Sequence, residues 1–126
     1  MKSIKLILPF LFFTSCFFKS DVKTIKGVYK IENRVYHFNN DSSIVEGYLF
    51  DRFSGHPLDY GTIHIKDKDI GTIPDSNGYF RLIIVEGAYS IVATSIGQTK
   101  LETKNINIKK NEKISIKINL GTHIID

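Results

Sequence analysis

The sequence predicts an all-β fold, an antiparallel β-sandwich of about seven short strands. The composition is rich in isoleucine, phenylalanine and tyrosine, with 9 Phe and 6 Tyr in 126 residues, and this bias favours strands over helices. Apolar residues alternate with polar ones in short runs that are separated by turns of Gly, Asn and Asp. No long window shows the 3.6-residue period of an amphipathic helix.

The length and charge indicate one domain that does not bind nucleic acid. The formal net charge is +4, and without Lys2 and Lys5 of the N-terminal segment 15 basic residues remain against 13 acidic ones. The lysines are dispersed, whereas a nucleic-acid footprint would cluster them on one face. A single cysteine excludes an internal disulfide and a zinc knuckle.

Residues 1–15 are predicted to be a signal peptide. Lys2 and Lys5 accompany an apolar run that is too short to span a bilayer but suits a signal-peptide core. Thr14 and Ser15 directly before Cys16 resemble the bacterial lipobox, although the usual leucine of that motif is Phe13 here. The resemblance implies cleavage before Cys16, a lipid anchor on Cys16 and a cell-envelope lipoprotein. The alternative is a plain signal peptide with an incidental cysteine.

The residue after Cys16 bears on localisation. It is Phe17, and the aspartate that typically retains lipoproteins in the inner membrane is absent. We therefore expect an outer-membrane lipoprotein that faces either the periplasm or the cell surface.

Residues 16–43 are predicted to join the anchor to the domain. Residues 17–26 read as a tether, and residues 27–38 as a weak hairpin that turns at Glu32 and Asn33. Residues 39–43 have the composition of a loop and mark the start of the domain.

The domain is predicted to span residues 44–121, followed by a tail over residues 122–126. Its strands are expected where apolar residues alternate along the chain, since side chains of a strand point to opposite faces in turn. A further strand is expected over residues 101–108. The inward positions of the other strands are Val45, Gly47 and Leu49; Gly61, Ile63 and Ile65; Phe80, Leu82 and Ile84; Tyr89, Ile91 and Ala93; and Ile114, Ile116, Ile118 and Leu120.

The turn Asp75-Ser76-Asn77-Gly78 is the centre of this pattern. Asp75 can accept backbone hydrogen bonds, and Asn77 and Gly78 tolerate positive φ, so the turn is expected to connect neighbouring strands of an antiparallel sheet. A calcium loop is the alternative, but Ile73 and Ile84 stand where an EF-hand needs acidic ligands. We therefore interpret the turn as structural.

Three groups of residues follow one another along the domain in a characteristic order. They are Val45, Gly47, Asp51, Gly55, Pro57, Leu58 and Ile63; then Gly71, Thr72, Asp75, Gly78, Phe80 and Leu82; then Gly87, Tyr89, Ile91 and Gly97. These ordered motifs resemble the carboxypeptidase regulatory-like family, whose domain is a transthyretin-like (prealbumin-like) β-sandwich. The resemblance covers about residues 45–120 and implies this fold and a domain without catalytic positions. Pro74, Tyr60 and Gln98 depart from the family pattern.

No residue pattern predicts an enzyme, a metal site or a cofactor. Ser54 and His56 are near neighbours, but no nucleophile elbow surrounds Ser54. Asp67 and Asp69 flank Lys68 in a predicted polar turn. The four histidines, His37, His56, His64 and His123, do not occur at ligand spacing.

Four aromatic residues form the candidate surface for a ligand or partner: Tyr48, Phe50, Tyr60 and Tyr79. The alternation turns Tyr48, Phe50 and Tyr79 away from the main core. One interpretation is that residues 27–38 or the edge of the second sheet cover them. The other is an exposed aromatic platform for a sugar ring or a partner protein.

Two classes of function follow from these observations. The first is a non-catalytic structural or protein-interaction module of an envelope lipoprotein. The second is a lipoprotein that binds a carbohydrate or another small ligand. A covered aromatic surface would favour the first, and an exposed aromatic cleft the second.

Overall fold

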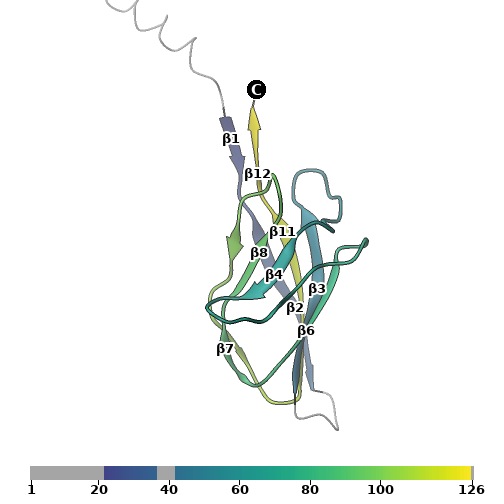
Figure 1. Cartoon of the computed structure of the whole chain (residues 1–126), viewed down its shortest axis with the longest axis vertical. Coiled ribbons are helices and arrows are strands. Elements are labelled where there is room, and N and C mark those ends of the chain that lie inside the picture. Colours follow the sequence, from purple (N-terminus) through teal and green to yellow (C-terminus); the bar gives the residue numbers. More distant parts are fainter. Residues whose placement is uncertain (1–21, 37–41, 126) are drawn as a thin grey trace, which may run out of the picture.

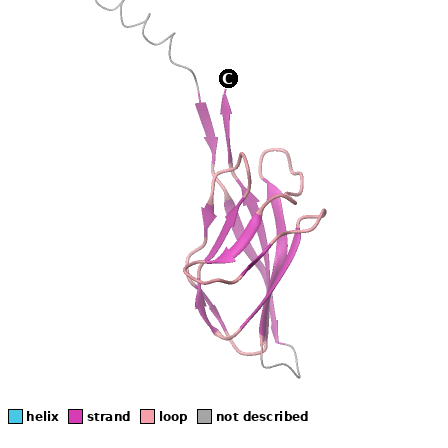
Figure 2. Ribbon diagram, viewed as in Figure 1, coloured by secondary structure: helices cyan, strands magenta, loops and turns pink. Residues whose placement is uncertain are grey.

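The computed structural model describes residues 22–36 and 42–125, and this part of the chain contains strands and no helix (Figures 1 and 2). The predicted all-β class is therefore confirmed. The strands are β1 (Val22–Ile25), β2 (Val28–Tyr36), β3 (Ser43–Asp51), β4 (Thr62–Ile65), β5 (Gly71–Thr72), β6 (Tyr79–Ile84), β7 (Gly87–Tyr89), β8 (Ile91–Thr94), β9 (Leu101–Glu102), β10 (Ile106–Ile108), β11 (Glu112–Leu120) and β12 (Thr122–Ile125).

The sandwich consists of two four-stranded sheets. The first sheet has the order β2-β11-β3-β6 and the second the order β5-β4-β8-β9. Two smaller pairs, β1-β12 and β10-β7, complete the described strands. These strands pair antiparallel except for β3 and β11, which run parallel in the middle of the first sheet.

The core lies between the two sheets and is built from the alternating positions that the sequence predicts. β11 has its inward side chains fully buried, and Phe80 on β6 is the largest of the side chains that are almost completely buried. Six of the positions predicted to point inward all belong to this core: Phe80, Leu82, Tyr89, Ile91, Ile116 and Ile118.

The predicted hairpin at Glu32 and Asn33 is wrong. β2 continues through both residues and pairs with β11, and the register shifts where Ser115 pairs with Asn33 and Ile116 with Ile31. Glu32 is the extra residue of this β-bulge. β2 is an edge strand with mostly exposed side chains, so it lacks the clean alternation that marks strands with one buried face.

The tether and the tail are also shorter than predicted. Val22–Ile25 forms β1 and pairs with β12, which lies in the predicted tail. Gly121 makes this possible, because a Cβ there would lie 1.8 Å from the carbonyl oxygen of Ile25. The β1-β12 ribbon extends the β2-β11 pair beyond the body of the sandwich (Figure 1). The predicted signal peptide and Cys16 lie outside the described residues.

The turn at residues 75–78 does not join neighbouring strands of one sheet. β5 before it pairs with β4, and β6 after it pairs with β3, so the chain crosses from the second sheet to the first. The predicted strand over residues 101–108 is divided as well. Thr103 interrupts it, because its hydroxyl accepts a 2.9 Å hydrogen bond from the amide of Ile91 and donates to the carbonyl of Lys104.

We call the end of the sandwich from which the β1-β12 ribbon projects the ribbon end. β3 and β11 run parallel towards it, so Asp51 and Leu120 both lie there. The loops after β3 and after β8 share this end, since Arg52 donates its amide hydrogen to the carbonyl of Leu120 and Gln98 pairs with Thr122.

Candidate functional site

Three of the four candidate aromatic residues meet on the outer face of the first sheet. Tyr48 and Tyr79 are register partners on β3 and β6, and their rings contact edge to face with centroids 5.5 Å apart. Phe50 lies two residues after Tyr48, and these two rings are 6.0 Å apart and within 10° of parallel. We call Tyr48, Phe50 and Tyr79 the aromatic cluster.

The aromatic cluster is not covered by β2. That strand lies beside β11 at the edge of the same sheet, two strands away from β3, so residues 28–36 do not provide the cover that one interpretation assigned to residues 27–38. Tyr48 keeps 43% of its surface exposed, and Phe50 and Tyr79 are partly buried. The cluster therefore lies on a sheet face that solvent can reach.

Lysines border the aromatic cluster. The ammonium group of Lys117 on β11 lies 5.4 Å from the centroid of the Phe50 ring, a distance typical of a cation–π contact. Lys30 on β2 is the register partner of Lys117. Glu46 lies near the cluster but its carboxylate is 3.6 Å from the ammonium group of Lys113. This part of the sheet face is therefore aromatic, and its border contains Lys117, Lys30 and the Glu46–Lys113 ion pair.

The surroundings of the aromatic cluster change the pKa of the Tyr79 hydroxyl. Partial burial, and then the negative charge of Glu46, raise the pKa of this phenol above its ordinary value. Arg81 acts in the opposite direction but does not outweigh them. Tyr79 is therefore a neutral hydrogen-bond donor at physiological pH.

Tyr60 does not belong to the aromatic cluster. It lies in the loop between β3 and β4 at the ribbon end, where it lines a shallow hollow together with Pro57, Leu58 and Ile96. Strand alternation cannot place a loop residue, which is why the sequence grouped Tyr60 with the others. Lys117 could not be identified from the sequence, because its approach to Phe50 depends on the pairing of β3 with β11.

The polar residues of the Asp75 turn serve the fold. The Asp75 carboxylate accepts hydrogen bonds of 2.9 Å and 3.0 Å from the amides of Asn77 and Tyr79, and Gly78 has φ +80°. One carboxylate oxygen thus takes both backbone donors, which is the arrangement of an Asx-type turn. Within the described ranges, no group of three or more His, Cys, Asp or Glu residues is placed to hold a metal ion.

The Ser54 hydroxyl is used in the same way. It donates a 2.8 Å hydrogen bond to the Asp51 carboxylate and accepts one from the amide of His56. The imidazole of His56 takes no part in these bonds. This loop therefore has the hydrogen-bond pattern of a structural turn.

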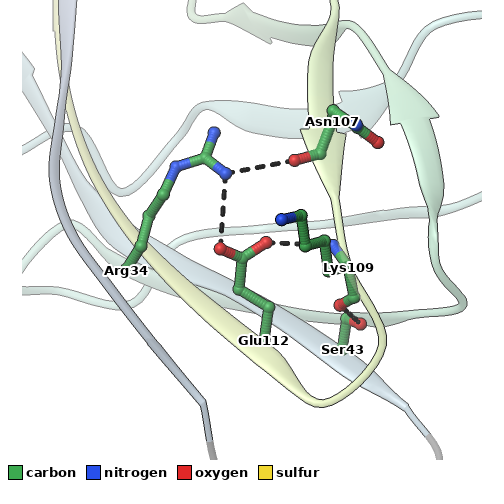
Figure 3. Close-up of polar contacts among 5 residues, drawn as sticks. All are labelled: Arg34, Ser43, Asn107, Lys109 and Glu112. Atoms are coloured by element: carbon green, nitrogen blue, oxygen red, sulfur yellow. Dashed lines mark hydrogen bonds and ion pairs between the residues drawn. The ribbon is translucent and has the colours of Figure 1, made fainter.

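A buried carboxylate closes the opposite end of the sandwich (Figure 3). Glu112 accepts hydrogen bonds from the Lys109 amide at 2.9 Å and from the Arg34 guanidinium at 3.3 Å. Arg34 also donates to the carbonyl of Asn107, and the Ser43 hydroxyl donates to the carbonyl of Lys109. These bonds join β2, β3 and the β10-β11 turn, so the cluster is structural.

The histidines do not converge. His123 lies on β12, where its Nδ1 is 3.0 Å from the hydroxyl of Thr24, while His64 is on β4 and His56 in the β3-β4 loop. His37 lies outside the described residues.

Comparison with known proteins identifies the domain type. The model of the CarboxypepD_reg-like domain family matches residues 45–126. No protein of curated function shows significant similarity to the chain. Across the residues that the structure describes, there is no helix with the length and apolar character that a membrane crossing requires.

Two similar solved structures are mutants of a type II cohesin–X-dockerin complex from Acetivibrio cellulolyticus. The C-terminal interface mutant has 23% identity and a TM-score of 0.48, and the N-terminal interface mutant 22% and 0.49. Each alignment covers 58% of this chain and 51% of the other, so this chain spans about half the length of those chains.

Proposed function

Because the chain belongs to the CarboxypepD_reg-like domain family, we propose that it is a non-catalytic protein-interaction module, held at the cell envelope by a lipid on Cys16. The aromatic cluster on the outer face of the first sheet carries the interaction part of this proposal. Aromatic residues supply much of the binding energy at protein interfaces, and a rim of charged residues commonly surrounds them.

The chemistry of the described residues supports a binding role. Tyr48 offers a half-exposed ring, Tyr79 a neutral hydroxyl and Lys117 a cation at the edge of the cluster. A partner surface with acidic groups around an apolar centre would complement this arrangement. The rigid β3-β6 pairing fixes the positions of Tyr48 and Tyr79 before binding, which lowers the entropic cost of association.

The interaction is tested by site-specific crosslinking in native membranes. A photoreactive amino acid at Tyr48 should crosslink one envelope protein, and the same group at exposed Lys68 in the β4-β5 turn should not. The product should disappear when Tyr79→Ala or Lys117→Glu is added. Equal products from both positions would show that the aromatic cluster does not select a partner.

Carbohydrate binding is the second candidate, favoured by the nearly parallel rings of Tyr48 and Phe50. Aromatic rings stack on the apolar faces of sugars. A glycan array probed with the full-length protein, and with Tyr48→Ala as the matched variant, separates the two functions. Binding to a defined glycan that Tyr48→Ala abolishes would replace the protein-interaction proposal.

The lipid anchor has its own test. The wild-type protein and the Cys16→Ala variant are expressed, labelled with a radioactive fatty acid and fractionated. Only the wild type should take up label and sediment with the outer membrane. If both variants label alike, or neither partitions into membranes, the protein is a secreted domain without a lipid anchor.

A further inference from the structure

The ribbon end carries three of the most exposed apolar side chains of the described residues. Phe53 and Tyr60 in the β3-β4 loop are 63% and 82% exposed, and Ile96 in the β8-β9 loop is 89% exposed. Large apolar side chains on a soluble surface are individually common, but a group of them at one place marks a contact surface.

Tyr60 and Ile96 border one hollow. They line it together with Pro57, Leu58, Asp59 and Ser95. β3 ends at Asp51 and β8 ends at Thr94, opposite Thr62, so both loops leave the sandwich at the ribbon end. Phe53 is on the same β3-β4 loop. We call Phe53, Tyr60 and Ile96 the apolar tip.

The loops that bear the apolar tip are held firmly at their bases. Asp51 and His56 are joined by a 2.8 Å backbone hydrogen bond, and Gly55 donates its amide hydrogen to the carbonyl of Asp51. Gln98 donates to the carbonyl of Ser95 in the second loop. The loops that carry the apolar side chains are therefore already ordered, so binding does not have to include the entropic cost of ordering them.

The position of β1 determines which end of the sandwich a lipid on Cys16 would hold near the membrane. β1 leaves the sandwich at the ribbon end, and Val22 is six residues after Cys16. Six residues span at most about 20 Å, and the four-residue strands of the ribbon add about 13 Å. A lipid on Cys16 would hold the ribbon end close to the bilayer, and a tilt of the ribbon would bring the loops onto the lipid surface.

We infer that the apolar tip docks onto the membrane surface by inserting Phe53, Tyr60 and Ile96 into the headgroup boundary. This inference rests on the proposed lipid anchor, which supplies the proximity. Tyrosine suits this position because its ring is apolar and its hydroxyl stays in the headgroup layer. Docking would then fix the orientation of the module and turn the aromatic cluster sideways to the membrane.

Charge should also contribute to this contact. Arg52, Lys26 and Lys100 lie at the ribbon end, and the Arg52 guanidinium donates a 2.6 Å hydrogen bond to the carbonyl of Lys26. Asp59 lies beside Tyr60 in the hollow and offsets part of their attraction to anionic lipids. Binding should therefore combine apolar insertion with an attraction to anionic lipids that salt screens.

The absence of tryptophan from the sequence permits a direct test. Single reporters are introduced as Tyr60→Trp and Ile96→Trp at the ribbon end. The matched control is Val85→Trp, which is also exposed but follows β6 at the opposite end, where Ile84 pairs with Ser43. Each full-length lipoprotein is reconstituted into vesicles of phosphatidylethanolamine and phosphatidylglycerol that contain brominated phosphatidylcholine.

The tryptophans at positions 60 and 96 should shift to shorter wavelength and lose most of their fluorescence to the brominated chains, while position 85 should not change. Equal, weak quenching at all three positions would overturn the docking inference. The loops would then be free for another contact, such as one with a protein partner. Flotation of the vesicles reports the anchor separately. If the protein floats with the vesicles but the tryptophan at position 60 is not quenched, the lipid anchor is supported and the docking inference is wrong.

A second measurement does not use the anchor. The Cys16→Ser chain without the signal peptide of residues 1–15 is mixed with the same vesicles, and its partition coefficient is compared with that of the corresponding Cys16→Ser, Tyr60→Ser double variant. Loss of one inserted ring should lower partitioning about tenfold. Unchanged partitioning would show that Tyr60 does not insert.

Discussion

Alanine substitution of two glycines with the same backbone conformation should have very different costs. Gly78 has φ +80° and Gly55 has φ +79°, so an L-residue at either position is strained by roughly 1–2 kcal/mol. Alanine also reduces the conformational entropy of the unfolded chain, which offsets about 0.4–1 kcal/mol of this destabilisation. The expected loss for Gly55→Ala is therefore about 1 kcal/mol, because nothing lies within 4 Å of its added Cβ.

Gly78→Ala carries an additional steric cost. Its Cβ would lie 2.5 Å from the carbonyl oxygen of Leu49 and 3.1 Å from Cβ of Pro57. Leu49 cannot move away freely, since its amide donates to the carbonyl of Gly78 and its carbonyl accepts from Leu58. Overpacking of this kind costs about 1–3 kcal/mol, so Gly78→Ala should lose roughly 2–4 kcal/mol in total.

Urea unfolding followed by far-UV circular dichroism measures both variants. The dependence on urea should keep the wild-type slope, so that the midpoint alone reports the change in stability. Gly97→Ala is a second control, because Gly97 has φ +81° and open space around its Cβ. If Gly78→Ala lowers the free energy of unfolding no more than the two controls do, the Asp75 turn does not approach β3 as closely as the structure shows.

Four further predictions concern the core, the turn, the aromatic cluster and the buried carboxylate. Phe80→Ala should lower the free energy of unfolding by about 3–5 kcal/mol in the same urea assay, because it empties an aromatic core site. Millimolar calcium should leave the melting temperature unchanged, and a rise that Asp75→Ala abolishes would contradict the structural interpretation of the turn. The raised pKa of Tyr79 means that folding favours the protonated phenol. The contribution of Tyr79 to folding stability is therefore present below the ordinary tyrosine pKa and is lost as pH rises through the higher pKa of the folded state. Tyr79→Phe should make the loss of folding stability at alkaline pH less steep. Arg34→Ala should destabilise more than Lys30→Ala on the same strand, since only Arg34 contacts a buried carboxylate, and equal midpoints in urea would refute this.

The sequence predicts strands well where one face is buried. β3, β4, β6 and β11 each place apolar side chains at every second position, because the sheet gives them an inner and an outer face. The same rule fails for β2, whose edge position leaves Lys30, Glu32 and Arg34 exposed on both sides of the strand.

Strand pairing was harder to predict than strand position. The parallel contact between β3 and β11 joins segments that are more than sixty residues apart, and no local turn chemistry indicates it. The Asp75 turn has the residues of a hairpin yet connects two sheets, since β5 before it pairs with β4 and β6 after it pairs with β3. The β1-β12 ribbon depends on a similarly distant pair of segments.

The candidate site shows the same division. Alternation turned Tyr48, Phe50 and Tyr79 outward, and the β3-β6 register then brought Tyr48 and Tyr79 together. Tyr60 has no such constraint in its loop. Tyr60 and Ile96 line one hollow because the β3-β4 and β8-β9 loops leave the sandwich at the same end, which the sequence pattern does not reveal.

The continuous path from β1 into β2 also determines how the module responds to mechanical load. A pull on the N-terminal strand runs along the strand axis into β2, which pairs with β11 over most of its length. If the aromatic cluster is held at the same time, the β2-β11 hydrogen bonds are loaded in shear and share the force. A pull between Val22 and Ile125, which are register partners, would instead peel the ribbon apart one pair at a time. The fold should therefore resist tension between β1 and the aromatic cluster far better than tension between Val22 and Ile125.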